Sequence, residues 1–244
     1  MRVVFIGTSD AFGAGGRRQS AIFVEGETGG LLLDCAPATT SGLASLGIER
    51  SAIDAIAISH FHADHFAGLP QFLLAAIYED RRREPLWIAG PPDIENRLHV
   101  LADAMGYGLG GVDLPFPLHF VELATDREVQ AGPARLAAFA THHQADTKPH
   151  GFRVTTRDRT IAYTGDTGWF EDLPSRLQGA DLAISECTFL ESSFEYHLDY
   201  ETLSARAGRF GCGRLLLTHL GPAMSERRGQ LDLETADDGT TLEL

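Results

Sequence analysis

The chain has 244 residues, of which 43% are hydrophobic and 22% charged, and its formal net charge is −14. A chain of this length can bury a core of its own, so we expect a single domain over residues 1–244. No apolar stretch approaches the eighteen or more residues of a membrane span, and the first apolar run is too short for a signal peptide. We therefore expect a cytoplasmic protein with no membrane partner.

The acidic balance argues against a nucleic-acid partner, because phosphate-backbone binding depends on lysine and arginine neutralising phosphates. Three cysteines, Cys35, Cys187 and Cys212, are odd in number and show no disulfide spacing. They fit a reducing compartment better than a disulfide scaffold.

Short apolar or β-branched runs between turn residues predict many strands. In chain order these are residues 2–6, 21–25, 31–34, 55–59, 86–89, 118–122, 135–141, 151–155, 160–163, 182–185 and 214–218. Helical patterns cover 69–79, 92–105 and 200–210, the last with Asp199 as its N-cap. Groups of strands with helices between them predict an α/β fold in which two sheets pack together and the helices lie outside.

A cluster of metal-ligand side chains follows the strand predicted at 55–59. His60, His62, Asp64 and His65 place three imidazoles and one carboxylate within six residues. Imidazole and carboxylate ligands suit zinc and similar divalent metals. Four such side chains rarely fall together by chance, so this segment predicts a metal site.

Further ligand-type residues follow other predicted strands. His142 and His143 follow the strand at 135–141, Asp166 follows 160–163, and His219 follows 214–218. Side chains at the ends of several strands converge in one crevice, which is typical of a functional site.

The order His60-Phe61-His62-Ala63-Asp64-His65, then His143, Asp166 and His219, resembles the signature of the metallo-β-lactamase superfamily. The resemblance covers almost the whole chain and is greatest to the ribonuclease Z-like and phosphodiesterase branch. It implies a four-layer αββα sandwich, with two mixed sheets and helices outside, in agreement with the predicted elements.

The resemblance also implies two divalent metal ions, usually Zn²⁺, with Mn²⁺ or Fe as alternatives. The implied ligands are His60, His62 and His143 for the first ion, Asp64, His65 and His219 for the second, and Asp166 between them. A bridging carboxylate offsets the repulsion between two dications. Aspartate at this position, where a true β-lactamase has cysteine, disfavours β-lactamase activity.

One ligand has two candidates. In the branch that the chain resembles, the histidine in question precedes a Gly-aromatic-Arg strand, here residues 151–153. The spacing favours His143 over its neighbour His142. Alanine variants of the two residues should differ in bound metal.

The predicted catalytic residues are Asp64, Glu186 and His197. Two dications lower the pKa of a shared water, so that a metal-bridging hydroxide attacks a phosphorus or carbonyl centre. Glu186 and His197 match the pair that donates a proton to the leaving group in this branch, because a carboxylate favours the protonated form of a neighbouring imidazole. Arg17, Arg18 and Lys148 are weaker candidates for binding an anionic group.

These residues predict a dinuclear metal-dependent hydrolase and favour a phosphodiesterase acting on a small anionic phosphodiester or cyclic phosphate, such as a cyclic nucleotide. The alternatives are a ribonuclease Z-like tRNA 3′-processing endonuclease and a lactone or thioester hydrolase. The acidic charge, and the 22 residues between His143 and Asp166, which leave no room for a long inserted arm, argue against the endonuclease. A non-catalytic binding protein is disfavoured by the complete ligand set. A homodimer through the apolar helix at 71–78 is a further expectation.

Overall fold

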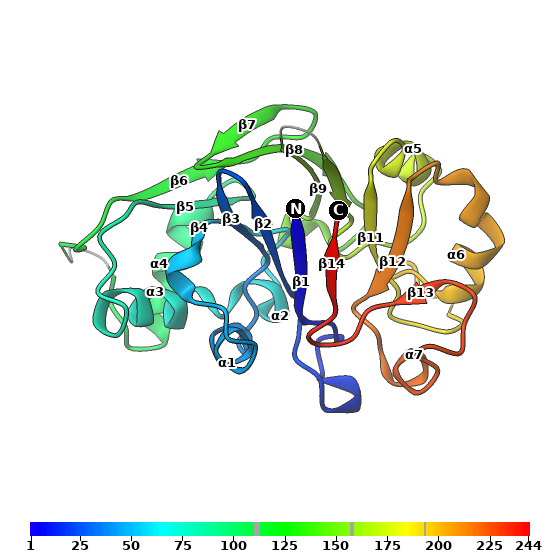
Figure 1. The fold of residues 1–244 in the computed structure, drawn as a ribbon, viewed down its shortest axis with the longest axis horizontal. Coiled ribbons are helices and arrows are strands. Elements are labelled where there is room, and N and C mark those ends of the chain that lie inside the picture. The colour runs from blue at the N-terminus through cyan, green and yellow to red at the C-terminus, as the bar shows by residue number, and fades with distance from the viewer. Residues whose placement is uncertain (110–112, 157–158, 193) are drawn as a thin grey trace.

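Two seven-stranded sheets form the centre of the computed structural model, which describes residues 1–244 except 110–112, 157–158 and 193 (Figure 1). The first sheet has the order β14-β1-β2-β3-β4-β5-β6 and the second β13-β12-β11-β10-β9-β8-β7. The bounds in the first sheet are β1 (Arg2–Gly7), β2 (Ala21–Gly26), β3 (Gly29–Leu33), β4 (Ile53–Ala57), β5 (Leu86–Gly90), β6 (Leu118–Glu122) and β14 (Thr241–Glu243). Those in the second are β7 (Glu128–Ala131), β8 (Ala134–Ala140), β9 (His150–Thr155), β10 (Thr160–Tyr163), β11 (Leu182–Glu186), β12 (Arg214–Thr218) and β13 (Glu234–Thr235).

Both sheets are mixed. In the first, β14, β1, β2 and β3 are antiparallel, whereas β3 to β6 run parallel. In the second, β7 to β10 are antiparallel and β10 to β13 parallel. The predicted α/β fold with two mixed sheets is therefore confirmed.

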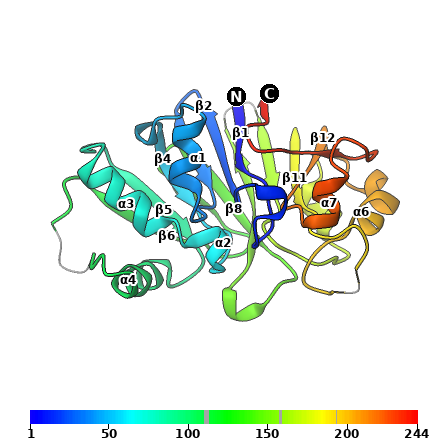
Figure 2. The same cartoon turned by 90° about the horizontal axis from the view of Figure 1, so that it is seen from below.

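Helices cover the outer face of each sheet, as Figure 2 shows from below. The first sheet carries α1 (Thr39–Ser45), α2 (Ala63–Phe66), α3 (Leu69–Tyr78) and α4 (Ile94–Ala104). The second carries α5 (Leu173–Leu177), α6 (Tyr200–Arg206) and α7 (Pro222–Glu226). Short 3₁₀ helices lie at Ala14–Gly16, Arg50–Ala52, Ala145–Thr147 and Ala207–Arg209.

Alternate side chains of each strand enter different cores, because successive residues in a strand point to opposite faces of the sheet. On β1, Val3 and Phe5 pack between the two sheets, while Val4 and Ile6 pack against the helices of the first sheet. A third cluster joins the second sheet to its own helices. Burial of both faces explains why the strands read as continuous apolar runs in the sequence.

All eleven predicted strands are present, with ends that differ by at most two residues. The sequence did not predict β7, β13 and β14, which have two to four residues and too little alternation to be recognised. It also did not predict the short helices α1, α2, α5 and α7. Asp199 caps α6 as predicted, since its carboxylate accepts a hydrogen bond from the Thr202 amide. The single-domain organisation over residues 1–244 stays a prediction.

Helix α3 packs its apolar side chains inside the protein. Leu69, Phe72, Leu73 and Ala76 are buried in the core between this helix and the first sheet, and Tyr78 alone among its large hydrophobic residues is strongly exposed. A homodimer through this helix stays a prediction, with less apolar surface to support it than the sequence indicated. Among the described residues, no helix combines the length and apolarity needed to cross a membrane.

The strand order brings five chemically active side chains to one edge of the sandwich. His60 follows β4 in the first sheet, whereas His143, Asp166 and His219 follow β8, β10 and β12 in the second, and Glu186 is the last residue of β11. Loops at the carboxyl ends of strands are common places for binding sites. The site therefore lies where loops from both sheets meet.

Candidate metal centre and active site

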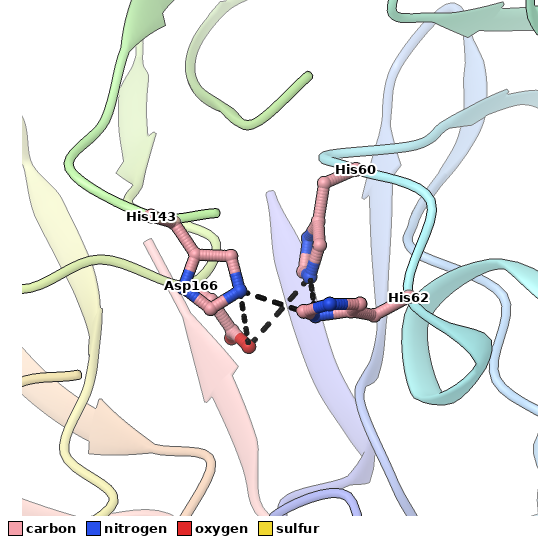
Figure 3. Close-up of side chains that lie close together, drawn as sticks. All are labelled: His60, His62, His143 and Asp166. Carbon is pink, nitrogen blue, oxygen red and sulfur yellow. Dashed lines mark hydrogen bonds and ion pairs between the residues drawn. The ribbon is translucent and has the colours of Figure 1, made fainter. Parts of the chain in front are cut away.

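The first group of ligand-type side chains consists of His60, His62, His143 and Asp166 (Figure 3). His62 Nδ1 lies 3.1 Å from His60 Nε2 and 3.1 Å from His143 Nε2. Asp166 Oδ2 lies 3.7 Å from His60 Nε2 and 4.0 Å from His143 Nε2. One ring nitrogen of each histidine and one carboxylate oxygen thus face a common point.

The outer nitrogens of these rings have partners of their own. The pairs are His60 Nδ1 with Ser59 Oγ at 3.0 Å, His62 Nε2 with Gln144 Oε1 at 3.0 Å, and His143 Nδ1 with the Tyr196 carbonyl at 2.8 Å. A carbonyl oxygen only accepts, so the outer nitrogens of His62 and His143 carry protons. Their inner nitrogens are left with lone pairs directed at the common point, as metal ligation requires.

The second group consists of Asp64, His65, Asp166 and His219. His65 Nε2 lies 3.3 Å from Asp64 Oδ2 and 3.2 Å from Asp166 Oδ1, and His219 Nε2 lies 3.2 and 3.5 Å from the same two oxygens. Asp166 therefore gives one carboxylate oxygen to each group. This is the geometry of a carboxylate that bridges two cations.

Asp34 holds His65 from behind. Its Oδ2 atom accepts hydrogen bonds from His65 Nδ1 at 2.7 Å, Tyr163 Oη at 2.7 Å and Ser59 Oγ at 2.9 Å, and the residue is fully buried. A carboxylate on the outer nitrogen fixes the ring orientation and makes the inner nitrogen a better metal ligand. The sequence analysis did not predict a role for Asp34.

The donor set fits divalent cations. His65 Nε2 and Asp166 Oδ1 are buried and have no hydrogen-bond partner, which is uncommon for buried polar atoms and requires an explanation. Burial alone would lower the pKa of His65 and of His219, but Asp166 and Asp64 raise both above the usual value. Protons or cations must therefore balance the two carboxylates, and metal ions would release those protons. The site is thus suited to divalent metal ions.

The structure places His143, and not His142, at the centre. His143 is 6% exposed and belongs to the first group, where burial lowers its pKa and keeps the ring neutral. The side chain of His142 is 46% exposed and its Nε2 lies 3.7 Å from Glu195. The assignment of His143 as a ligand stays a prediction, and the geometry supports it.

Glu186 and His197 lie beside both groups as a close pair. His197 Nδ1 donates to Glu186 Oε1 at 2.8 Å, and the backbone amide of Thr167 donates to the same oxygen. Burial would lower the pKa of His197, but Glu186, helped by Asp166, raises it to about 9. His197 is therefore protonated at neutral pH, and its Nε2–H is free to serve a substrate.

Thr188 joins this pair to the second group. Its hydroxyl lies 2.9 Å from Glu186 Oε2 and 2.9 Å from His219 Nδ1. Because a carboxylate oxygen only accepts, the hydroxyl donates to Glu186 and accepts from the His219 ring. The lone pair of His219 then lies on Nε2, toward Asp64. The sequence analysis did not predict a role for Thr188, and only its position two residues after Glu186 was a signal.

A cavity of about 620 Å³ opens over the centre. It is lined by Asp10, Ala11, Phe12, Ala14, His62, Ala63, Asp64, His143, Gln144, Asp166, Thr188, Phe189, Phe194, His197, His219 and Pro222. None of these described lining residues is lysine or arginine, and seven of the sixteen, including three phenylalanines, are apolar. A volume of this size is suited to a small ligand.

The three basic residues considered as anion-binding candidates have other partners. Arg17 is 8% exposed and binds the Thr8 hydroxyl and the Leu220 carbonyl, so it joins the loop after β1 to the loop that carries His219. Arg18 binds the Ile6 carbonyl and lies 3.5 Å from Asp238. Lys148 Nζ donates to the Pro92 carbonyl. Binding of an anionic group by these residues stays a prediction, and the contacts described here set the directions of the three side chains.

A family model described as "Anti-Pycsar protein Apyc1" matches residues 1–235. The chain belongs to this family. The Apyc1-family chain is also 34% identical over 160 residues to a ribonuclease Z of Halorubrum lacusprofundi, an alignment that covers 65% of the chain and 49% of that protein. A ribonuclease Z of Ignicoccus hospitalis is 26% identical over 280 residues, covering 95% of the chain and 91% of the relative.

Among solved structures, the metallo-β-lactamase fold protein YhfI of Bacillus subtilis superposes on this Apyc1-family chain with a TM-score of 0.80 at 23% identity, covering 100% of the chain and 99% of YhfI. The predicted metallo-β-lactamase sandwich is therefore confirmed. The fold, the ribonuclease Z relatives and the two His/Asp groups together confirm the predicted class, a metal-dependent hydrolase.

Proposed function

We propose that this protein is a dinuclear phosphodiesterase that hydrolyses a small phosphodiester or cyclic phosphate. The observation that carries the proposal is the Glu186–His197 pair beside two ligand groups that share Asp166. A phosphodiester releases an alkoxide, which needs a proton to depart. The pair supplies a proton donor at the place where a substrate bound over the ligand groups would need one.

Two divalent cations, proposed to be Zn²⁺, would be held by the two groups. The proposed ligands are His60, His62 and His143 for one ion, Asp64, His65 and His219 for the other, and Asp166 for both. A donor set of five histidines and two carboxylates suits zinc better than magnesium or calcium. When bound, the cations supply Lewis acidity at the phosphoryl oxygen and a water-derived nucleophile at neutral pH.

The chain's own residues position the substrate's leaving group and protonate it. His197 Nδ1 donates a hydrogen bond to Glu186, so proton transfer to the leaving oxygen occurs from Nε2, and His197 lines the cavity. Glu186 is held by the amide and hydroxyl of Thr188 and by the amide of Thr167. The fixed negative charge of Glu186 keeps His197 protonated until the proton is transferred to the leaving oxygen.

A small substrate with one anionic group suits the cavity. The cations would meet a single phosphodiester charge, but among the described lining residues no lysine or arginine would meet a second phosphate. This supports a phosphodiester or cyclic phosphate over a longer polyanion. The ribonuclease Z relatives support hydrolysis at phosphorus, whereas the net charge of −14 disfavours tRNA as the substrate.

The test uses two phosphodiesters with different leaving groups. We expect the metal-loaded protein to hydrolyse a cyclic nucleoside monophosphate and an activated nitrophenyl phosphodiester. His197→Ala should keep its metal and lower kcat on the cyclic phosphate by about 10² to 10⁴, while turnover of the nitrophenyl ester, whose phenolate leaves without a proton, stays nearly normal. His119→Ala, a histidine exposed on β6, is the control.

Equal losses on both substrates would show that His197 is not the proton donor. Turnover of lactones or thioesters with no phosphodiesterase activity would overturn the proposed reaction. Faster cleavage of a precursor tRNA than of any small phosphodiester would favour the endonuclease instead.

A further inference from the structure

Phe12 combines strong exposure with a fixed position at the mouth of the cavity. It is 93% exposed, more than the other exposed large hydrophobic side chains among the described residues. It also lines the cavity over the ligand groups. A single exposed phenylalanine is ordinary on a protein surface. Its position beside the proposed reaction centre makes this one informative.

The backbone around Phe12 is held in place. Asp10 Oδ1 accepts hydrogen bonds from the amides of Phe12 at 3.2 Å and Ala14 at 3.1 Å, and from the Ser9 hydroxyl at 3.0 Å. Arg17 joins the end of the same loop to Thr8 and Leu220. Asp10 and Arg17 are both buried. A ring presented on a fixed backbone loses little entropy when it contacts a ligand.

A second aromatic side chain of the lining, Phe194, adjoins the proton donor. It is 47% exposed, and its ring stacks on His197 with centroids 5.7 Å apart and an interplanar angle of 26°. Phe189 meets it edge to face at 6.3 Å. The surroundings of the proposed reaction centre therefore include aromatic side chains, and no lysine or arginine is among the described lining residues.

We propose that Phe12 is a specificity-determining residue whose ring stacks on a flat, uncharged heteroaromatic group, such as a nucleobase, of the phosphodiester bound at the ligand groups. The inference rests on the proposed function and deepens it. Stacking recognises the π-face that every base has, so Phe12 selects substrates that carry a base without selecting one base. The ligand groups bind the charged phosphodiester of the substrate, and Phe12 contacts its flat heteroaromatic group.

The experiment compares two substrates with and without a base. One is a 3′,5′-cyclic nucleoside monophosphate, and the other is the same cyclic ribose phosphate with hydrogen in place of the base. We expect Phe12→Ala to lower kcat/KM about tenfold on the first, mainly through KM, and to leave the second unchanged. Phe12→Trp should restore the preference. Tyr78→Ala, which removes an exposed aromatic ring of α3 outside the cavity, should change neither.

Equilibrium binding separates this inference from the proposed function. Calorimetry with a nucleoside monophosphate and with ribose phosphate should show an affinity for the nucleotide that Phe12→Ala lowers about tenfold. If that loss occurs in a protein that hydrolyses no phosphodiester, the inference stands and the proposed function fails. If both cyclic phosphates are hydrolysed and Phe12→Ala affects them equally or not at all, the inference fails and the proposed function stands. A change of oligomeric state in Phe12→Ala would assign the ring to a protein contact instead.

Discussion

Each histidine of the candidate metal centre has one ring nitrogen directed into its ligand group and one directed outward. The residue that contacts the outer nitrogen decides which of the two nitrogens carries the proton. Asp34 orients His65, Thr188 orients His219, and a backbone carbonyl orients His143. Each outer contact leaves a lone pair on the inner nitrogen. At the scale of single residues, the metal-binding capacity therefore depends on side chains that touch no metal.

Metal content should separate the two adjacent histidines. His143→Ala removes a ring of the first group, so we expect an affinity loss of about tenfold or more, read as a lower metal-to-protein ratio by elemental analysis after dialysis. His142→Ala should keep the ratio of the unaltered protein, since its side chain is half exposed. The reverse result would make His142 the ligand.

Thr188 offers a test of the outer contacts. Thr188→Val preserves the shape but removes the hydroxyl, which leaves His219 Nδ1–H without its acceptor. We expect zinc affinity to fall about 10- to 100-fold in a competition with a fluorescent chelator, and Thr188→Ser to retain it. Equal affinity in the valine and serine variants would mean that the hydroxyl does not orient the ring.

At the scale of elements, helix α6 is fixed directly after the loop that carries His197. Asp199 caps the helix through the Thr202 amide, and the amide of Tyr200 donates to the Phe189 carbonyl. Asp199 and Tyr200 thus begin the helix and also join it to the segment that follows Glu186. The position of the proton donor depends on where this helix begins.

Loss of this cap should cost a typical capping energy. We expect Asp199→Ala to lower the free energy of unfolding by about 1 kcal/mol, because the Thr202 amide loses its acceptor. Urea unfolding followed by circular dichroism measures the change. The matched control is Asp172→Ala, since Asp172 occupies the N-cap position of α5 without a side-chain hydrogen bond. A loss of the same size in the control would exclude capping as the cause.

At the scale of the whole molecule, the proposed ligands come from both sheets. His60, His62, Asp64 and His65 follow β4 in the first sheet, and the other three follow strands of the second. Cations that bind only the folded chain stabilise it by mass action. Because the ligands span residues 60 to 219, unfolding of either sheet would release the cations.

Removal of metal should therefore lower the melting temperature. With free metal about 100 times the Kd, the stabilisation is about 2.7 kcal/mol, which predicts a decrease in Tm of roughly 5–10 °C when a chelator is added. Differential scanning calorimetry measures the shift. His60→Ala, which lacks one proposed ligand, should show a smaller shift. An unchanged Tm in the unaltered protein would contradict metal binding by the folded state.

Sequence patterns predicted eleven strands and the proposed ligands because both depend on short segments of the chain. Apolar runs marked the eleven longer strands, and each proposed ligand follows one of them. The two-residue strand β13 depends on pairing with β12 and has no such local signal. Asp34 was not predicted because it contacts His65 across 31 residues, and the hydrogen bond from Arg17 to the Leu220 carbonyl was not predicted because the two residues lie 203 positions apart.

Asp166 belongs to both ligand groups, with Oδ2 directed to one and Oδ1 to the other. In the proposed two-ion centre, the carboxylate cannot adjust to one cation without altering the field at the other. The two binding equilibria are then linked, and each ion changes the affinity of its neighbour by the same factor. If two ions bind as proposed, metal loading and metal exchange at this centre would be cooperative, since the affinity of each ion would depend on whether its neighbour is bound.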